Sequence, residues 1–251
     1  MNASNTTVVI SRHQKDVSWT QKFVQNGFHV IVYDHNSHGN HPYYISSNNG
    51  REASVYLKYI VDYYESLSTY TVFLQDDDTS WHHRDSIVDL VLARLGKRSK
   101  YYNLNKKCLG IIQSNDLWPT MRKFFAKYMA PYIGDIEQYG EFTPGFKCCA
   151  QFIVHSDRVR EHPKKMYEGI LKYVVERPDP GTPNPQQARG HMLEWTWHLL
   201  FDNPFAPYNK DKKKPAQFRA EMEDKKNSIL RQKKSNLDNR RKARLNGCDI
   251  L

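Results

Sequence analysis

Three consecutive carboxylates, Asp76, Asp77 and Asp78, directly follow an apolar run in the first third of the chain. That run, residues 70–74, is β-branched and aromatic, which is typical of a buried strand. Ligands of open α/β sheets bind at the carboxyl ends of strands, and adjacent carboxylates repel one another unless a cation or a donor lies between them. Asp76 and Asp78 therefore predict a Mn²⁺ or Mg²⁺ site with hard oxygen ligands. A solvated acidic turn or a helix cap is the alternative.

Aromatic and imidazole groups follow the acids in the same stretch. Trp81, His82 and His83 come shortly after Asp78. A tryptophan can stack on a sugar ring, and a histidine can bind a metal. We predict Trp81 and His82 in a substrate pocket, with capping and packing at the next helix as the alternative.

Polar residues also follow the two apolar runs that precede the acids. Arg12 and His13 come after the first run, and Asp34 closes the second. Carboxyl ends of parallel strands meet at one edge of a sheet, so these side chains should lie near the acids. An arginine pairs with phosphate, and a carboxylate accepts hydrogen bonds from a ribose or base. Surface loop positions are the alternative. The donor-binding residues predicted on these loops are Arg12, His13, Asp34, Asp76 and Asp77.

A further phosphate contact is predicted where a helix begins. Arg51 stands between Gly50 and Glu52. Free backbone N–H groups and a guanidinium at such a position suit a phosphate, so Arg51 is also predicted to bind the donor. Glu52 is equally consistent with an acid that caps the first turn.

One carboxylate lies among tryptophans late in the apolar part of the chain. Glu194 stands between Leu193 and Trp195. Burial of an unpaired carboxylate is costly and raises its pKa, which suits a general base. We predict Glu194 as the catalytic residue and Trp195 as part of the pocket. A buried structural ion pair is the alternative for Glu194.

Two histidines accompany this acid. His191 and His198 are seven positions apart, and two helical turns would place them on one face. His198 is predicted as a metal ligand, and a hydrogen-bonded core histidine is the alternative.

Alternating strands and helices must position these groups. Apolar patterning predicts strands at residues 6–11, 28–33, 70–74, 108–112 and 146–154. Helical spacing predicts helices at residues 17–26, 51–67, 85–95, 118–129 and 191–201, with one or two more within 156–175. Residues 177–188 contain four prolines and predict a loop. The order predicts an α/β fold with a Rossmann-type mixed, mainly parallel sheet flanked by helices. The glycine fingerprints of dinucleotide and P-loop sites are absent.

The formal net charge of +10 belongs to the end of the 251-residue chain. Residues 210–244 carry 14 Lys and Arg against 5 Asp and Glu, whereas residues 1–209 carry 23 against 21. Phe218 is the only aromatic residue of the basic stretch, which does not favour nucleic-acid binding. We predict a domain over residues 1–209 and a basic, partly helical or disordered tail over residues 210–251. Such a tail suits an acidic surface or membrane headgroups.

Cysteine usage and apolar patterning bear on the compartment. The four cysteines are sparse, and Cys148 and Cys149 are adjacent, which is poor geometry for an ordinary bridge. Reduced cysteines are therefore expected. With no hydrophobic signal region and no membrane-length apolar stretch, we expect a soluble, cytoplasmic protein.

The order of strand, Asp-x-Asp motif and later carboxylate resembles the GT-A class of nucleotide-sugar glycosyltransferases. In that class, loops after the first two strands hold the nucleotide, and the Asp-x-Asp motif binds the metal and the diphosphate. A downstream acid serves the acceptor. The resemblance implies these roles for Asp76, Asp78 and Glu194.

A second resemblance is more specific and spans about residues 7–205. It is to a eukaryotic and viral family that is catalogued as a domain of unknown function. The motifs that carry it are Gly50-Arg51-Glu52-Ala53, Tyr56-Leu57, Val72-Phe73-Leu74, Trp81-His82, Cys148-Cys149-Ala150-Gln151-Phe152 and Leu193-Glu194-Trp195-Thr196-Trp197-His198. The sugar transferases with which large algal viruses decorate their capsid protein are the closest functional parallel.

Together these features predict transfer of a sugar from a UDP- or GDP-sugar to a hydroxyl of a glycan or glycoprotein. In an inverting reaction Glu194 would take the acceptor proton. One alternative is a metal-dependent hydrolase that uses Asp76, Asp78 and His82. Another is a non-catalytic protein that docks on an acidic partner through its basic tail.

Overall fold

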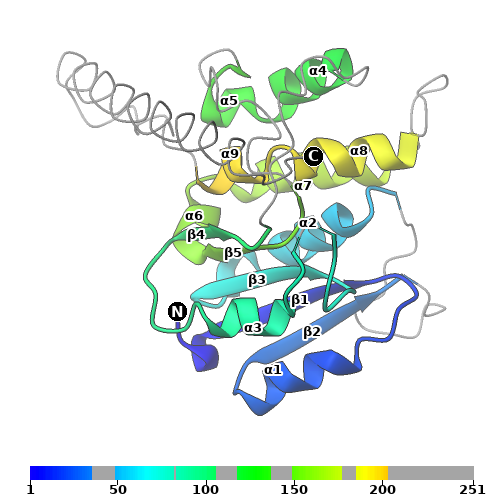
Figure 1. Ribbon diagram of the computed structural model, residues 1–251. Helices are drawn as coiled ribbons and strands as arrows, with labels where there is room; N and C mark the ends of the chain where they lie inside the picture. The colour runs from blue at the N-terminus through cyan, green and yellow to red at the C-terminus, as the bar shows by residue number, and fades with distance from the viewer. Residues whose placement is uncertain (36–48, 82, 106–117, 137–148, 177–184, 203–251) are drawn as a thin grey trace, which may run out of the picture. The chain divides into compact units, whose positions relative to one another are not determined.

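The computed structural model describes residues 1–35, 49–81, 83–105, 118–136, 149–176 and 185–202 (Figure 1). The chain divides into two units, Met1–Ala206 and Pro207–Leu251. The second unit lies outside the described residues, as does the strand predicted at residues 108–112. The catalytic role of the first unit and the character of the tail stay predictions.

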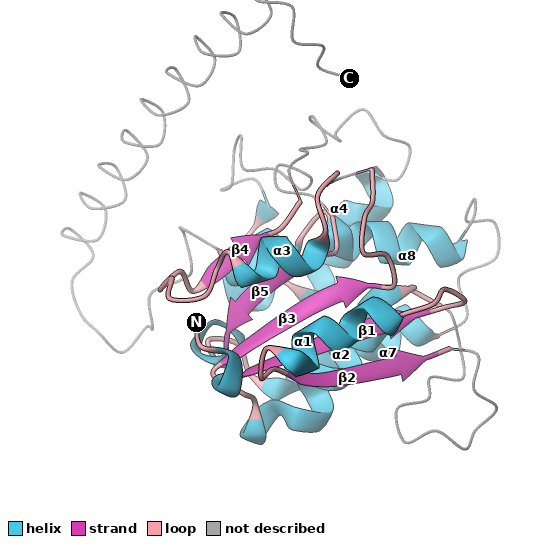
Figure 2. Cartoon of the chain, turned by 60° about the horizontal axis from the view of Figure 1, so that its bottom comes forward, coloured by secondary structure: helices cyan, strands magenta, loops and turns pink. Residues whose placement is uncertain are grey.

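A five-stranded sheet forms the centre of the first unit, in the order β2-β1-β3-β5-β4. The strands are β1 (Thr6–Arg12), β2 (His29–Asp34), β3 (Tyr70–Gln75), β4 (Tyr101–Asn103) and β5 (Phe152–His155). Strand β1 runs parallel to β2 and β3, whose arrows point the same way in Figure 2, whereas β5 runs antiparallel to β3 and β4. The predicted mixed α/β fold is confirmed.

The strand register gathers the predicted loops at one edge of the sheet. Arg12, the last residue of β1, pairs with Asp34, the last residue of β2. Ser11 pairs with Gln75, the last residue of β3. The acids that follow β3 therefore begin beside the loop that follows β1, and we call this side the carboxyl edge.

Helices cover both faces of the sheet. Figure 1 shows α1 and α3 on one face and α2, α7 and α8 on the other. The helices are α1 (Gln21–Gln25), α2 (Glu52–Tyr63), α3 (Ile87–Leu92), α4 (Trp118–Tyr128), α5 (Ala130–Ile133), α6 (Ser156–Arg160), α7 (Lys164–Val175), α8 (Pro185–Glu194) and α9 (Trp197–Phe201). Short 3-10 turns lie at Ala3–Asn5, Ser18–Thr20 and Tyr64–Ser66. No described helix is long and apolar enough to cross a membrane.

The two faces of the sheet have separate apolar cores. On β1, Val8 and Ile10 join the core under α1 and α3, while Val9 joins the core under α2. This alternation follows the two-residue period of a strand.

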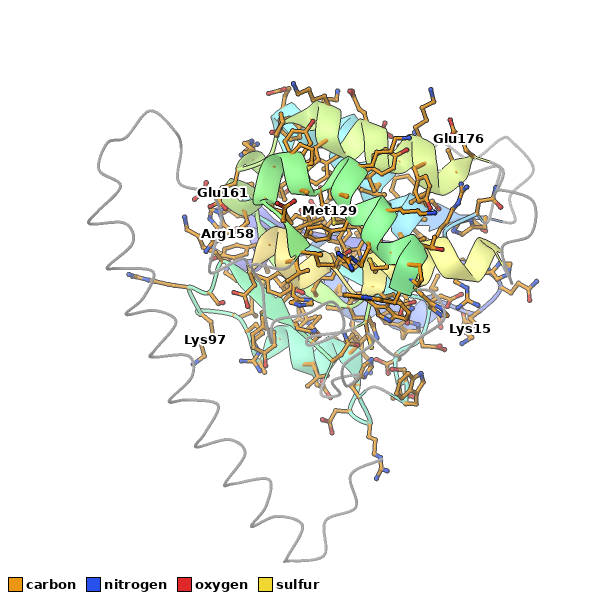
Figure 3. All side chains as sticks on the ribbon, turned by 90° about the horizontal axis from the view of Figure 1, so that it is seen from above. Lys15, Lys97, Met129, Arg158, Glu161 and Glu176 are labelled. Carbon is orange, nitrogen blue, oxygen red and sulfur yellow. The ribbon has the colours of Figure 1, made fainter. Side chains whose placement is uncertain are left out.

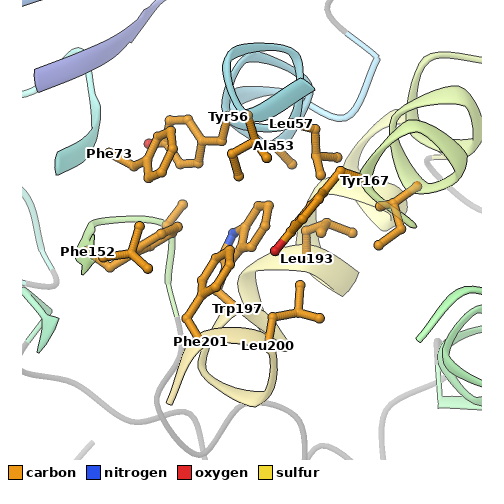
Figure 4. Packing of buried hydrophobic residues seen from close by; sticks show 14 of the residues in the cluster. Ala53, Tyr56, Leu57, Phe73, Phe152, Tyr167, Leu193, Trp197, Leu200 and Phe201 are labelled. Atoms are coloured by element: carbon orange, nitrogen blue, oxygen red, sulfur yellow. The ribbon is translucent and has the colours of Figure 1, made fainter. Parts of the chain in front are cut away.

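An aromatic cluster holds α2 against the sheet (Figure 4). The rings of Tyr56 and Phe73 have centroids 4.7 Å apart, and those of Phe152 and Trp197 are 5.4 Å apart. These contacts join α2, β3, β5 and α9, so the position of each helix depends on the others.

The helix predicted over residues 191–201 is interrupted, and the prediction of one continuous helix is wrong. Helix α8 ends at Glu194 and α9 begins at Trp197. The Thr196 hydroxyl donates to the Met192 carbonyl oxygen at 2.7 Å, and the Thr196 N–H donates to the Leu193 carbonyl oxygen at 2.9 Å. These bonds tighten the last turn and replace the regular ladder. His191 and His198 therefore lie on two separate helices, α8 and α9.

Two other boundaries differ from the sequence prediction. Strand β5 begins at Phe152, because Cys149 has φ 81°, a left-handed conformation that a strand does not accept. Helix α8 begins at Pro185, inside the predicted loop, since proline suits the first turn of a helix. The short strand β4 was not predicted.

Cys149 also corrects the expectation of reduced cysteines. It is disulfide-bonded, and its partner lies outside the described residues. A structural disulfide is typical of an oxidising compartment.

Candidate functional site

Two of the predicted donor-binding side chains contact each other at the carboxyl edge. Arg12 Nη1 lies 3.2 Å from Asp34 Oδ2, and Arg12 Nε donates to the Lys15 carbonyl oxygen at 3.0 Å. The guanidinium therefore spans the ends of β1 and β2. Its side chain is 39% exposed, so one face of the ion pair stays open to solvent.

Asp76 binds the loop that follows β1. Its Oδ2 accepts the backbone N–H groups of His13 at 2.9 Å and of Gln14 and Lys15 at 3.4 Å. The Lys15 ammonium pairs with the neighbouring Asp77. The structure thus brings His13 next to Asp76 through its backbone.

Asp78 holds the start of α3. Its Oδ1 accepts the Ser86 hydroxyl at 2.7 Å, and its carbonyl oxygen accepts the Ile87 N–H at 2.7 Å. This is the helix-capping arrangement that the sequence left as an alternative. We call Asp76, Asp77 and Asp78 the aspartate corner; each of the three carboxylates has a donor from the protein.

The predicted metal ligands do not converge as a three-residue set. The described residues contain no group of three His, Cys, Asp or Glu side chains that could hold a metal ion. His198 is 4% exposed and belongs to α9. The carboxylate oxygens of Asp76 and Asp78 are still of the type that Mn²⁺ and Mg²⁺ prefer.

Of the two pocket residues predicted on this loop, the structure describes Trp81. Trp81 is 60% exposed and stands in a tight turn in which Ser80 and His83 exchange backbone hydrogen bonds of 3.1 and 3.2 Å. His82 lies outside the described residues. Trp81 is thus exposed to solvent on a turn that the buried side chain of His83 anchors to the protein.

Two hydrogen bonds hold the buried side chain of His83 in place. His83 Nδ1 donates to the Asp85 carbonyl oxygen at 2.9 Å, so its Nε2 accepts the Gln151 side-chain amide at 2.7 Å. Both side chains are buried. These hydrogen bonds link the loop after β3 to the residue before β5.

Glu194 meets a second glutamate that the sequence offered only as a helix cap. Glu52 is the first residue of α2 and is 6% exposed, and Glu194 is the last residue of α8 and is half-buried. The two side chains are hydrogen-bonded, and the Gln75 amide donates to Glu52. We call Glu52 and Glu194 the glutamate pair.

The environment of the glutamate pair favours a bound proton. Burial raises the pKa of Glu194 well above its ordinary value, and the neighbouring charge of Glu52 raises it further. Burial also raises the pKa of Glu52. The positive charge of Arg51 acts in the opposite direction on both pKa values. The pair therefore keeps a proton to higher pH than an ordinary glutamate does.

Close backbone packing brings the two helix ends together. A Cβ added to Gly190 would lie 3.2 Å from the Gly50 carbonyl oxygen and 3.7 Å from Arg51 Cδ. A Cβ on Gly50 would lie 1.9 Å from Val174 Cγ1. Gly50 and Arg51 also have φ of 76° and 52°. The start of α2 thus reaches its place through a left-handed turn against α7 and α8.

Tyr56 relates the glutamate pair to the aspartate corner. Burial raises the pKa of its hydroxyl well above the ordinary value, and the charges of Glu52, Glu194 and Asp76 raise it further. The carboxyl groups of Glu52, Glu194 and Asp76 are therefore all close enough to Tyr56 for their charges to act on its hydroxyl.

The residues around Glu194 fix its backbone and one wall. Trp195 is buried and stacks on His191, with ring centroids 5.9 Å apart and planes at 15°. The Cys149 N–H donates to the Glu194 carbonyl oxygen at 3.2 Å. Trp195 is therefore a core residue beside the pair, in contrast to the exposed Trp81.

The functional partners that sequence reasoning missed are Glu52, Gln75 and Gln151. Glu52 was recognised as an acid at a helix start, but its burial depends on the approach of α8. Gln75 and Gln151 are uncharged residues at strand ends, and their spacing gives no sign of a partner. The Gly-Arg-Glu run at residues 50–52 was the one available signal.

Comparison with known proteins gives a family for this chain. Residues 7–217 match the model of a family described as "Protein of unknown function (DUF3431)". No curated protein and no solved structure matches the chain. The matched range contains the aspartate corner and the glutamate pair. The chain, with this site at the carboxyl edge of its sheet, belongs to the DUF3431 family.

Proposed function

We propose that the protein is a glycosyltransferase with a GT-A-like fold that moves a sugar from a nucleoside-diphosphate donor to a hydroxyl of a glycan or glycoprotein. The observation that carries the proposal is the glutamate pair at the carboxyl edge, with Arg51 beside it and the aspartate corner on the same side. This combines a proton acceptor, positive charge and strand-end loops in one place.

The basic side chains of this edge suit a diphosphate. Arg12 and Lys15 lie in and after β1, and Arg51 precedes the 12-residue helix α2. Guanidinium groups bind phosphate oxygens through paired N–H donors, and the start of a helix adds a favourable field. Asp34, beside Arg12, would accept hydrogen bonds from a ribose or base.

A divalent metal remains part of the proposal. Mn²⁺ or Mg²⁺ would be held by carboxylate oxygens of Asp76 and Asp78 and would offset the charge of the diphosphate. Asp77, paired with Lys15, would stay at the margin of the donor site.

The proposed proton transfer involves the more exposed member of the glutamate pair. As the acceptor oxygen attacks the anomeric carbon, its proton moves to Glu194, and the proton that the pair already holds lies on Glu52 during this step. The bond from the anomeric carbon to the diphosphate breaks, and its electron pair leaves with the diphosphate. Glu194 is half-buried and Glu52 is buried, so Glu194 is assigned the contact with the acceptor.

The separation of the two carboxyl groups does not suit glycoside hydrolysis. Glycosidases place their two carboxyl groups about 5 to 9.5 Å apart so that a sugar, or a sugar and a water, fits between them. Glu52 and Glu194 share a hydrogen bond and are too close for this. The pair supports acid–base work as one unit.

Ligand binding gives a direct test. We would measure the melting temperature of the full chain with UDP-sugars and GDP-sugars, with and without Mn²⁺. A ligand at about a hundredfold excess over its dissociation constant adds about 2.7 kcal/mol to the unfolding free energy. One nucleotide sugar should raise the melting temperature, and the rise should be smaller in Arg12→Ala and Asp78→Ala.

The matched control is Arg158→Ala. Arg158 pairs with Glu161 at 3.0 Å on the side of the molecule away from Lys15 (Figure 3), so this variant should respond like the wild type. If no nucleotide sugar changes the melting temperature, the proposal is wrong. Product analysis then separates transfer to an added acceptor from release of free sugar, which a hydrolase would give.

Two further assignments stay predictions. The tail over residues 210–251 is proposed to contact anionic membrane headgroups, and sedimentation with anionic vesicles should decrease when it is deleted. The second is the cytoplasmic location. The disulfide at Cys149 weighs against it, because cytoplasmic cysteines are usually reduced. Alkylation of free thiols before reduction, in freshly lysed cells that express the protein, would show which state Cys149 has.

A further inference from the structure

We propose that Glu52 is a positioning residue that shares one proton with Glu194 and holds it in the orientation needed to receive the acceptor proton. The catalytic half of this inference rests on the proposed function. The proton-sharing half concerns the folded protein alone and is tested without substrate.

The geometry around Glu52 leaves one proton as the natural complement. Glu52 is buried at the start of α2, its side chain is hydrogen-bonded to Glu194, and the Gln75 amide donates to it. Two carboxylates in hydrogen-bond contact cannot both stay ionised, because their repulsion is strong where water is excluded. A proton between them converts that repulsion into a charge-assisted hydrogen bond.

Unpaired polar atoms mark the same place. Glu52 Oε1 and the Tyr56 hydroxyl are buried and have no hydrogen-bond partner within the described part of the chain. They lie on successive turns of α2. Buried polar groups without partners reduce stability, so their presence beside a carboxyl pair points to a use in proton transfer or ligand contact.

The backbone shows that this contact is built into the fold. The left-handed Gly50 and Arg51 and the close approach of Gly190 to Gly50 set the start of α2 against α8. No other described acid takes this position: Asp76, which also acts on Tyr56, is engaged by backbone N–H groups.

The charge balance around the pair involves several elements. The titratable and charged groups that act on the pair or on its neighbour Tyr56 are Arg51 and Tyr56 near the start of α2, Asp76 after β3, and His191 on α8, whose pKa is lowered by burial and by Arg51. Arg51 is the one cation among them at neutral pH. One proton on the glutamate pair leaves a single negative charge there, which Arg51 balances.

The sign of the pH effect on stability follows from the raised pKa values. Because the folded protein binds a proton that the unfolded chain has released, the pair favours folding less and less as pH rises above the ordinary glutamate range. Its contribution is therefore most favourable at acid pH and is lost as pH passes through the raised pKa. Buried His162 has a lowered pKa and acts in the opposite sense, since the folded state resists its protonation.

The first experiment measures unfolding free energy by denaturant from about pH 5 to about pH 8. We compare the full wild-type chain with Glu52→Gln and Glu194→Gln. Each variant removes one titrating group and keeps a hydrogen-bonding side chain. Both should lose less stability than the wild type as pH rises.

The matched control for this series is Asp62→Asn. Asp62 is a solvent-facing acid on α2 that pairs with Lys58 at 2.8 Å. This variant should keep the pH dependence of the wild type. In parallel, the carbonyl stretch of a protonated carboxyl group should be visible in the infrared spectrum of the wild type at neutral pH and absent from Glu194→Gln.

The second experiment uses the pH dependence of transfer. In Glu52→Gln the charge beside Glu194 is gone, so the acid limb of kcat should move to lower pH by about one unit or more. A merely structural role of Glu52 would lower kcat at every pH without moving the limb. Asp62→Asn should leave the profile unchanged.

The outcomes separate the two proposals. Equal pH dependence of stability in the wild type and in Glu52→Gln, with no protonated carboxyl signal at neutral pH, overturns the shared proton. If Glu52→Gln does not fold, the infrared spectrum of the wild type still decides this. A shared proton in a protein that binds no nucleotide sugar supports the pair and overturns the glycosyltransferase proposal.

Discussion

The aspartate corner and the glutamate pair are both clusters of acids at the same edge of the sheet, but they are stabilised in opposite ways. The aspartate corner is partly exposed, and its carboxylates are bound by backbone N–H groups, Lys15 and Ser86. The glutamate pair is more deeply buried, and its members bond to each other. The negative charges of the aspartate corner are stabilised by hydrogen-bond donors and by the Lys15 ammonium, whereas the proposed shared proton removes one negative charge from the glutamate pair.

This difference indicates that the aspartate corner holds loops in place, whereas the glutamate pair is suited to acid–base chemistry. Asp76 and Asp78 connect the loops after β1 and β3 to the start of α3, and would thereby shape the proposed binding site of the sugar donor. Glu52 and Glu194 have raised pKa values, which is the property that proton transfer near neutral pH requires. Two clusters with the same residue chemistry are thus expected to fail differently when they are changed.

The largest effect is expected from Glu194→Gln. The amide keeps the size and hydrogen-bonding capacity of the side chain but cannot accept a proton, so turnover should fall by about 10²- to 10⁴-fold. Unfolding free energy at neutral pH should be equal to or higher than that of the wild type, because the variant does not have to take up a proton when it folds. Sugar transfer and denaturant unfolding are the two measurements.

Glu161→Gln is the control for that variant. Glu161 pairs with Arg158 on the far side of the molecule (Figure 3) and should leave turnover unchanged. Full activity of Glu194→Gln would show that the pair has no catalytic role and would leave the aspartate corner as the remaining centre of the site.

The next effect is expected from Gly50→Ala, which acts on the packing that forms the glutamate pair. The added methyl group would stand 1.9 Å from Val174 Cγ1, in a backbone with φ 76°. Overpacking and the left-handed conformation together should cost about 2 to 4 kcal/mol of unfolding free energy. Thermal or denaturant unfolding measures this cost.

Gly96→Ala is the matched control, because Gly96 has nearly the same φ, 75°, with nothing within 4 Å of the added Cβ. It should lose only about 1 kcal/mol. If both variants lose the same amount, close packing at Gly50 does not contribute, and the start of α2 is free to move away from α8.

The smallest effect on unfolding free energy is expected at the aspartate corner. Asp76→Ala removes the acceptor of three backbone N–H groups in a partly exposed loop, and should lower the unfolding free energy by about 1 kcal/mol. Asp77→Asn removes only a solvent-exposed pair with Lys15 and should change it by less than about 1 kcal/mol. A loss for Asp76→Ala as large as that of Gly50→Ala would contradict the contrast between the two regions.

Much of the fold was predictable from local pattern. The strands at residues 6–11, 28–33 and 70–74 are confirmed, because β-branched and aromatic residues in short runs are the residues that a covered sheet selects. Their parallel order brought Arg12 and Asp34 together as expected. The site at the carboxyl edge could thus be located, although its metal and ligands stay predictions.

The remaining differences arise from hydrogen bonds and a cross-link that the apolar pattern of the sequence does not reveal. The helix break after Glu194 depends on Thr196, whose hydroxyl competes for a helix carbonyl. The spacing of apolar residues along the sequence does not reveal that competition. The disulfide of Cys149 likewise requires a partner that adjacent cysteines alone did not suggest.

The sequence by itself determined that acids, arginines and aromatic residues would meet where parallel strands end, because strand patterning and connectivity fix that edge. Only the tertiary structure decided which acids are bound by donors and which share a proton. Protonation depends on burial and on the distance between charges, and both are set by the approach of α2 to α8. A carboxylate has the same local sequence signal in either environment, and folding alone supplies its partner.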